Sequence, residues 1–342
     1  MGIAFKDLIT RSETQIDSLK GKILAIDSYN LLYQFLTTIR ARDGTLLTDS
    51  KGNTTSHLVG LFARTTKLMQ QGLKLAFVFD GKPPDLKLAE RNRRRELKLQ
   101  AEIEYKKAVA DKDIDAMKKF AGRTTRLTPD LINEAKMLIQ YLGLPIIQAP
   151  SEGEAQAAHI VKQGNAYATV SQDYDTLLHS SPMLIRNLSI AGKRKTNNKL
   201  NYETVKPELI NLSLNLNNLG IDQDQLIALA LLVGTDYNIG GIKGIGPKKA
   251  LDLIKKHNKD FDALFSKVKW DDHFDNPWTD IYYLIKKMSV TDDYELTWGE
   301  IDAVSLSNFL VDKHDFSDER VTNSIKRISE KKQNQRGLAE FL

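Results

Sequence analysis

The sequence predicts an α/β protein with a mostly parallel central sheet and helices on both of its faces. Short apolar runs rich in β-branched residues alternate with longer segments in which apolar residues recur every three to four positions, which is typical of this class. The chain has 342 residues and is 41% apolar, which is enough for a sizeable core. The expected strands are 22–28, 74–80, 144–149, 166–171 and 183–187.

Two helices are expected between these strands. The apolar residues of the segment 58–69 fall on one helical face, and Gly72 ends that helix. Further along, Thr128 can cap a helix whose first turn holds Pro129, and that helix should stop at Gly143. Each helix returns the chain to the sheet, as a parallel arrangement requires.

The remaining segments differ from this alternation. Residues 82–125 are too charged for a core and too rich in helix formers for a simple loop, so they predict a helical insertion. From about residue 222 the pattern becomes helical. The last dozen residues predict a flexible tail that ends in a small apolar cluster.

Composition excludes several classes of site. There are 49 basic and 44 acidic residues, a net charge of +5 that is compatible with a polyanionic partner but does not establish one. The absence of cysteine excludes disulfides, thiolate zinc sites and cysteine nucleophiles. The six histidines lack metal-binding spacing and are expected to be packing or surface residues. No membrane span or secretion signal is evident, so an intracellular protein is expected.

Carboxylates follow several of the predicted strands. Asp27 and Asp80 each stand at the carboxyl end of a strand, where open α/β sheets form their ligand crevice. Any one of them could be a helix cap or a turn residue, so the interpretation rests on the whole set. Pro150 and Ser151 are expected to open a helix with two glutamates in its first turn. The full set is Asp27, Asp80, Glu152, Glu154, Asp173, Asp175 and Asp236.

So many carboxylates in one place need positive charge, because like charges at short range repel each other. Oxygen ligands without thiolate or imidazole favour Mg²⁺, with Mn²⁺ as a substitute, over zinc. Two such ions about 4 Å apart would support phosphodiester hydrolysis. The chemical alternative is a phosphatase with Asp27 as covalent nucleophile, but the residues SYN that follow Asp27 do not match the DxD or DxxxT-like start expected there.

Basic residues dominate the segment that follows Asp80. Nine cations face five acids between residues 82 and 107. Such a run can simply be a solvated helical face, but beside a metal cluster it could draw a phosphodiester backbone into the site. The cations are Lys82, Lys87, Arg91, Arg93, Arg94, Arg95, Lys98, Lys106 and Lys107.

A glycine-rich turn, GIKGIGPKKA at 241–250, joins two apolar helical segments. Gly244 and Gly246 let backbone N–H groups approach a phosphate, and Lys248 and Lys249 add charge at the start of the next helix. The turn predicts a helix-hairpin-helix that reads the DNA backbone without reading sequence. The alternative is a plain turn between helices.

Taken together, the motifs resemble flap endonucleases of the XPG/Rad2 family. They are MGI, ILAIDSYNLLYQF, FVFDGKPPDLK, APSEGEAQAA, SQDYDTL and VGTDYNIGGIKGIGPKKA, which run from residue 1 to about residue 257. The resemblance implies a PIN-like 5′ nuclease fold in one nuclease domain over 1–322. Within it, 82–127 would be a helical arch and 220–258 a helix-hairpin-helix module.

The resemblance also implies roles for individual residues. The seven carboxylates match the metal ligands of the family, and Lys87 and Arg94 match the basic pair that contacts the scissile phosphate. Tyr33 matches the aromatic residue on which a nucleotide stacks, and Gly2 would lie near the site. The residues expected to bind DNA are Gly2, Tyr33, Arg91, Arg95, Gly244, Gly246, Lys248 and Lys249. The hairpin of the family also binds a monovalent cation, typically K⁺.

The C-terminal tail, 323–342, resembles one that docks on the sliding clamp PCNA. Gln335, Leu338, Phe341 and Leu342 match the QxxLxxFF motif, although Leu342 replaces its last aromatic residue. Because the chain stops at this motif, an archaeal member is expected.

The function expected from the resemblance is that of a 5′-flap endonuclease and 5′–3′ exonuclease in Okazaki-fragment maturation and base-excision repair. The protein would act on branched DNA as a monomer in the cytoplasm. One alternative is a PIN-like ribonuclease, which would not need the hairpin. The other is a clamp-bound DNA scaffold that has lost its activity, against which all seven carboxylates argue.

Overall fold

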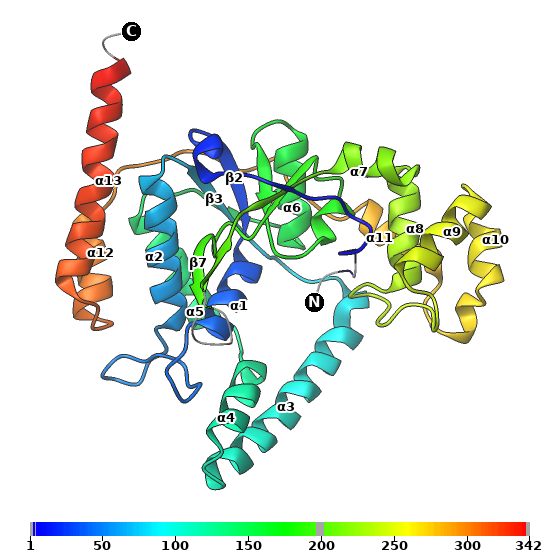
Figure 1. The fold of residues 1–342 in the computed structure, drawn as a ribbon, viewed down its shortest axis with the longest axis horizontal. Helices are drawn as coiled ribbons and strands as arrows, with labels where there is room; N and C mark the ends of the chain where they lie inside the picture. Colours follow the sequence, from blue (N-terminus) through cyan, green and yellow to red (C-terminus); the bar gives the residue numbers. More distant parts are fainter. Residues whose placement is uncertain (1–2, 4, 196–201, 340–342) are drawn as a thin grey trace.

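A seven-stranded mixed sheet forms the centre of the protein (Figure 1). The computed structural model describes the chain except for residues 1–2, 4, 196–201 and 340–342. Neighbouring strands follow the order β1 (Ser12–Glu13), β9 (Glu208–Asn211), β6 (Met183–Arg186), β5 (Ala168–Val170), β2 (Ile23–Asp27), β3 (Lys74–Phe79) and β4 (Ile146–Gln148).

The five expected strands are β6, β5, β2, β3 and β4, which lie side by side in that order and pair in parallel. The predicted α/β class with a mostly parallel sheet is therefore confirmed. Two short strands were not predicted: β9 pairs antiparallel with β6, and β1 pairs antiparallel with β9. A separate antiparallel hairpin, β7 (Gly192–Lys195) and β8 (Tyr202–Val205), was also missed.

Helices cover both faces of the sheet because its central strands are apolar on both sides. In β3, Phe77 packs with α1 (Ser28–Thr38), α2 (Ser56–Gln70) and α5 (Pro129–Tyr141). The alternate residues Ala76 and Val78 pack with α6 (Gly153–Lys162) on the other face. Strands buried on both faces are what a parallel sheet requires.

The ends of these helices largely follow the sequence. Gly72 has φ of 83° after α2, and Gly143 has φ of 68° after α5, so both occupy the left-handed region that glycine tolerates. The Thr128 side chain accepts a hydrogen bond from Leu131 N at 3.4 Å and caps α5. The expected start of α6 is wrong by two residues, because Glu152 is its N-cap and the helix begins at Gly153.

The insertion after β3 is helical, as predicted. It consists of α3 (Leu88–Ala110) and α4 (Ile114–Ala121), which project from the body as a two-helix arm (Figure 1). Asp113 caps α4 by accepting hydrogen bonds from the backbone N–H groups of residues 115 and 116. We call residues 82–127 the arch.

The segment after the sheet is helical and has its own core. It contains α7 (Leu212–Leu219), α8 (Gln223–Val233), α9 (Pro247–His257), α10 (Phe261–Lys267) and α11 (Trp278–Lys286). Helix α8 is buried almost all round, which agrees with its continuous apolar sequence. Pro247 opens α9, and the expected hairpin at 241–250 lies between α8 and α9.

The C-terminal segment differs from the expected flexible tail. After α12 (Ala303–Ser307) and a π-turn at Asn308–Asp312, α13 runs over Asp318–Ala339. Val321 and Ile328 are buried, and Ile325 packs on the core beside them. Their spacing of four and then three residues lets one helical face bury apolar surface, so the boundary predicted at residue 323 falls inside a packed helix.

No helix in the described ranges is both long enough and apolar enough to cross a membrane.

Candidate active site

All seven carboxylates singled out in the sequence line one cavity of about 730 Å³. Parallel strands bring four of them together, because Asp27 ends β2, Asp80 follows β3, and Asp173 and Asp175 follow β5. The N-terminus of α6 contributes Glu152 and Glu154. Asp236 enters from the loop after α8. The set is thus gathered from distant parts of the sequence.

Hydrogen bonds from neighbouring groups orient the aspartates. Asp80 Oδ1 accepts from Gly153 N at 2.8 Å, and Asp175 Oδ1 accepts from Ile3 N at 2.9 Å. Ser171 Oγ donates to Asp27 Oδ2 at 3.0 Å.

Asn30 is hydrogen-bonded to both Asp27 and Asp173, and this role was not predicted from the sequence. Its backbone N–H donates to Asp27 Oδ1 at 3.1 Å, and its side chain donates to Asp173 Oδ2 at 2.9 Å. Its Oδ1 accepts from Gln172 N at 3.1 Å. Its position could have indicated this role, because Asn30 lies three residues after Asp27, in the first turn of the helix that directly follows β2.

A close backbone approach joins the segments that carry Asp80 and Glu152. Gly81 N donates to Ser151 O at 2.6 Å. A Cβ atom on Gly81 would lie 2.2 Å from the carbonyl oxygen of Ala149, so only glycine fits here without moving the backbone. This contact fixes the spacing of two carboxylates.

The carboxylates are buried or half-buried, and they lie close enough together to raise one another's pKa. Burial, with the negative charges of Asp27 and Glu152, raises the pKa of Asp80 to about 7. Burial and the Asp173 charge raise the pKa of Asp175 to about 7. Burial also raises the pKa of Asp27 to about 6 and, together with Asp175, raises the pKa of Glu154 well above its usual value. The site therefore favours the binding of cations.

Two cations from the base of the arch already contact this cluster. The Lys87 ammonium contacts Glu152 and lies 3.3 Å from Asp236 Oδ2. Arg94 Nη2 donates to Asp236 Oδ1 at 2.6 Å. Burial alone would lower the pKa of Lys87, but Glu154, Glu152 and Asp236 outweigh it and raise that pKa. The arch thus carries positive charge into the site, as the sequence suggested.

The donor set fits hard divalent cations. It consists of carboxylate oxygens, and the chain has no cysteine. Within the described residues, no group of three or more histidine, aspartate or glutamate side chains is arranged to hold an ion as it stands. Lys87 and Arg94 contact carboxylate oxygens of Glu152 and Asp236, so an ion bound to those oxygens would have to displace them.

The outer part of the cavity is aromatic and basic. Tyr33 lies on α1 at its wall, and Lys98 of α3 stands over its ring at 5.2 Å from the centroid. Leu97, Phe120 and Arg123 of the arch line the same opening.

Other predicted DNA contacts lie outside this cavity. Arg91 and Arg95 are exposed on α3, and Gly244, Gly246, Lys248 and Lys249 are exposed at the hairpin. Gly2, Phe341 and Leu342 lie outside the described residues, and the side chains of Gln335 and Leu338 are not described.

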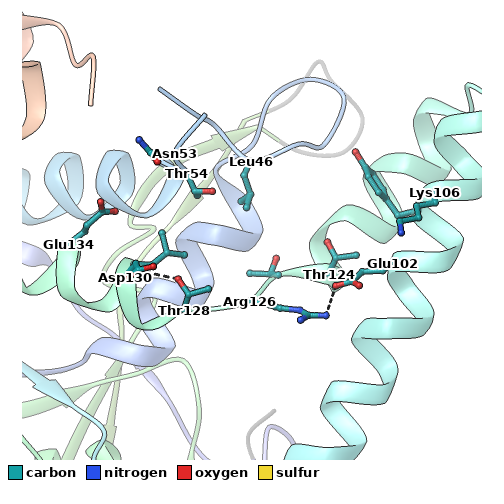
Figure 2. A pocket seen from close by; sticks show the side chains of 13 residues that line it. Leu46, Asn53, Thr54, Glu102, Lys106, Thr124, Arg126, Thr128, Asp130 and Glu134 are labelled. Carbon is teal, nitrogen blue, oxygen red and sulfur yellow. Dashed lines mark hydrogen bonds and ion pairs between the residues drawn. The ribbon is translucent and has the colours of Figure 1, made fainter. Parts of the chain in front are cut away.

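A second cavity, of about 470 Å³, lies between α3, the segment before α5 and the loop before α2 (Figure 2). None of the residues predicted to bind metal, the scissile phosphate, DNA or the clamp lines it, although Lys106 of the basic segment does. Arg126 crosses it and donates to Glu102 Oε1 of α3 at 2.6 Å. Its charged lining is mixed, with Lys106 and Arg126 facing Glu102, Asp130 and Glu134, so it has no clear preference for a phosphate backbone.

Comparison with known proteins identifies the family. The XPG N-terminal domain matches residues 1–101, and the XPG I-region matches residues 143–236. Flap endonuclease 1 of Pyrococcus abyssi is 51% identical over 332 residues, covering 96% of this chain and 94% of that protein. The chain belongs to the flap endonuclease family. It is a structure-specific flap endonuclease, and nucleases of this family are metal-dependent and serve in DNA replication and repair.

Further relatives agree with this assignment. Flap endonuclease 1 of Thermococcus onnurineus is 50% identical over 335 residues, covering 96% of this chain and 94% of that protein. The flap endonuclease-1 structure from Methanococcus jannaschii matches with a TM-score of 0.77 at 39% identity, covering 98% of this chain and all of that one. The catalytic core of Rad2 in complex with DNA substrate has the same fold, with a TM-score of 0.70 at 23% identity.

Proposed function

We propose that this flap endonuclease hydrolyses a phosphodiester beside the junction of 5′-flap DNA, as an endonuclease and a 5′–3′ exonuclease, with two Mg²⁺ ions held by the seven carboxylates. The observation that carries the proposal is the convergence of these carboxylates with Lys87 and Arg94 in one cavity. When bound, the two ions would supply an activated water and neutralise the charge that develops on the phosphate. Mn²⁺ has the same ligand preferences and is expected to substitute.

The residues of the chain would orient the DNA strand around that site. Lys87 would leave Glu152 and Asp236, and Arg94 would leave Asp236, to contact oxygens of the scissile phosphate. Two cations in a partly buried cavity stabilise negative charge strongly there. Tyr33 would stack on the nucleotide next to the cut. Arg91 and Arg95, exposed on the arch, would attract the backbone of the displaced strand.

The hairpin would hold the duplex. Gly244 has φ of 80° and is exposed, so its backbone can approach a phosphate closely. Lys248 and Lys249 stand in the first turn of α9, where the helix N-terminus also favours an anion. A K⁺ ion bound to carbonyl oxygens of this hairpin is part of the proposal, as is the division into the arch, the hairpin module at 220–258 and the nuclease body.

The C-terminal residues from Gln335 to Leu342 are proposed to dock on a PCNA-type sliding clamp. The support is the QxxLxxFF-like sequence, with Leu342 in place of the last aromatic residue. Docking would deliver the enzyme to Okazaki-fragment ends and repair sites in an archaeal cytoplasm. Gly2 is proposed to lie beside the DNA.

Cleavage of a double-flap DNA with and without Mg²⁺ tests the function directly. Activity should require the metal and be abolished by a chelator. Asp80→Ala and Asp173→Ala should abolish cleavage and leave flap binding largely intact, while Asp312→Ala, at an exposed position before α13 and outside the cavity, should cleave normally. Wild-type rates for either site variant would show that the metal assignment is wrong. Faster cleavage of a matched RNA flap would favour a ribonuclease.

A further inference from the structure

A buried glutamate near the start of α3 lies directly against Arg94. Glu90 has only 2% of its surface exposed, although most of α3 is solvated. Its Oε1 accepts a hydrogen bond from Arg94 Nε at 2.5 Å, one helical turn further along. The Arg94 guanidinium also donates from Nη2 to Asp236 Oδ1 at 2.6 Å. Arg94 is therefore held between its own helix and the loop that follows α8.

A second arginine fixes the Glu90 carboxylate. Arg93 donates from Nε to Oε2 at 2.6 Å and from Nη2 to Oε1 at 2.8 Å, a two-point contact that sets the plane of the carboxylate. Burial alone would raise the pKa of Glu90, but the hydrogen bonds from Arg93 and Arg94 outweigh it and hold that pKa below its usual value. Glu90 is thus a charged and fully paired group.

We propose that Glu90 is a positioning residue for cleavage, which holds the Arg94 guanidinium in the orientation that meets the scissile phosphate. This inference rests on the role proposed for Arg94. An arginine side chain has several rotatable bonds, and fixing them before the substrate arrives removes an entropy cost from the reaction. Glu90 need not touch DNA, so its loss should affect the rate of the chemical step more than flap binding.

Glu90→Gln is the informative change, because glutamine keeps the size of the side chain but replaces one acceptor with an amide donor facing two arginines. Single-turnover cleavage of double-flap DNA at saturating enzyme should slow by about 10- to 100-fold, with the flap Kd changed less than about threefold. Glu102→Gln is the matched control. Glu102 lies on the same helix as Glu90 and also accepts from an arginine, but its partner is Arg126 at the second cavity (Figure 2), and this variant should cleave at the wild-type rate.

The thermal unfolding midpoint shows whether the variant is folded. If Glu90→Gln does not fold, Glu90→Asp provides the test, because it keeps the charge but draws it back from Arg94, and it should slow cleavage in the same way. Because Glu90 acts through Arg94, the E90Q/R94A double variant should cleave as fast as R94A alone.

Two results would overturn the inference. One is a wild-type rate for Glu90→Gln. The other is that Glu90→Gln slows cleavage by the same factor in the R94A variant as in the wild type, which would show that Glu90 acts independently of Arg94. The role of Arg94 is read separately: a slow R94A with a normal E90Q refutes only the role of Glu90, whereas a normal R94A refutes the role proposed for Arg94 and this inference with it.

Discussion

The contact at Gly81 gives a prediction whose size follows from the structure. In Gly81→Ala the new Cβ would lie 2.2 Å from Ala149 O and 2.6 Å from Pro150 O. Ordinary contacts begin near 3.4 Å, so the two backbone segments must separate by roughly 1 Å. Neither neighbour is a flexible side chain that could turn away. The separation would displace Asp80, which precedes Gly81, relative to Glu152, which follows Pro150 closely.

Both the rate and the stability should fall. A displacement of about 1 Å at a reacting centre costs on the order of 100-fold in rate. Overpacking costs about 1–3 kcal/mol of unfolding free energy. With an unfolding entropy of about 2.1 cal/mol/K per residue, a chain of 342 residues should lose about 1.5–4 °C in its thermal midpoint.

Single-turnover cleavage of double-flap DNA and calorimetry measure the two effects separately. Gly122→Ala is the matched control, because Gly122 has helical φ of −62° and no heavy atom lies within 4 Å of its added Cβ. That variant should cleave normally and unfold at the same temperature or slightly higher. A Gly81→Ala enzyme with wild-type rate and midpoint would refute the argument that this contact sets the carboxylate spacing.

Three other predictions concern separate parts of the molecule. Lys87→Ala and Arg94→Ala should each raise the barrier to single-turnover cleavage by about 2–4 kcal/mol with little loss of flap binding. If flap binding weakened by as much as cleavage slowed, these residues would be simple backbone anchors. Burial lowers the pKa of His57 below its usual 6.5, so stability should be full above pH 6.5 and fall as the pH drops below it. The thermal midpoint from about pH 8 to about pH 5 tests this, and an equal fall in His57→Gln would contradict it. Truncation after Glu330 should abolish stimulation by the clamp and leave cleavage without the clamp unchanged; persistent stimulation would place the docking site elsewhere.

The central strands and most of the acidic site could be predicted from sequence for the same reason. Buried parallel strands are continuous apolar runs, and their carboxyl ends share one edge of the sheet, so Asp27, Asp80 and Asp173 could be placed together. Asp236 is different, because it lies far along the chain beyond a helical segment. Its inclusion in the set rested on residue type and on the family resemblance, because no strand end predicts its position, and the structure places it in the cavity.

Other features had weaker signals in the sequence. The strands β1 and β9 are two and four residues long, too short for a clear alternation of apolar and polar residues. The packed start of α13 did have a signal, since Val321, Ile325 and Ile328 recur at helical spacing. Its charged surroundings, with lysine and glutamine after Glu330, suggested a solvated tail instead.

By itself the sequence determined the α/β class, the helical insertion, the turn between α8 and α9, and the chemical type of the site, because each depends on local periodicity or on residue type. The tertiary structure decided which charges meet. Glu90 looks like any other acid in a charged helix, yet it is buried against Arg93 and Arg94. Lys87 reaches Glu152 across the fold. Such pairings depend on how distant segments pack and on how little water remains between them, which one-dimensional spacing does not encode.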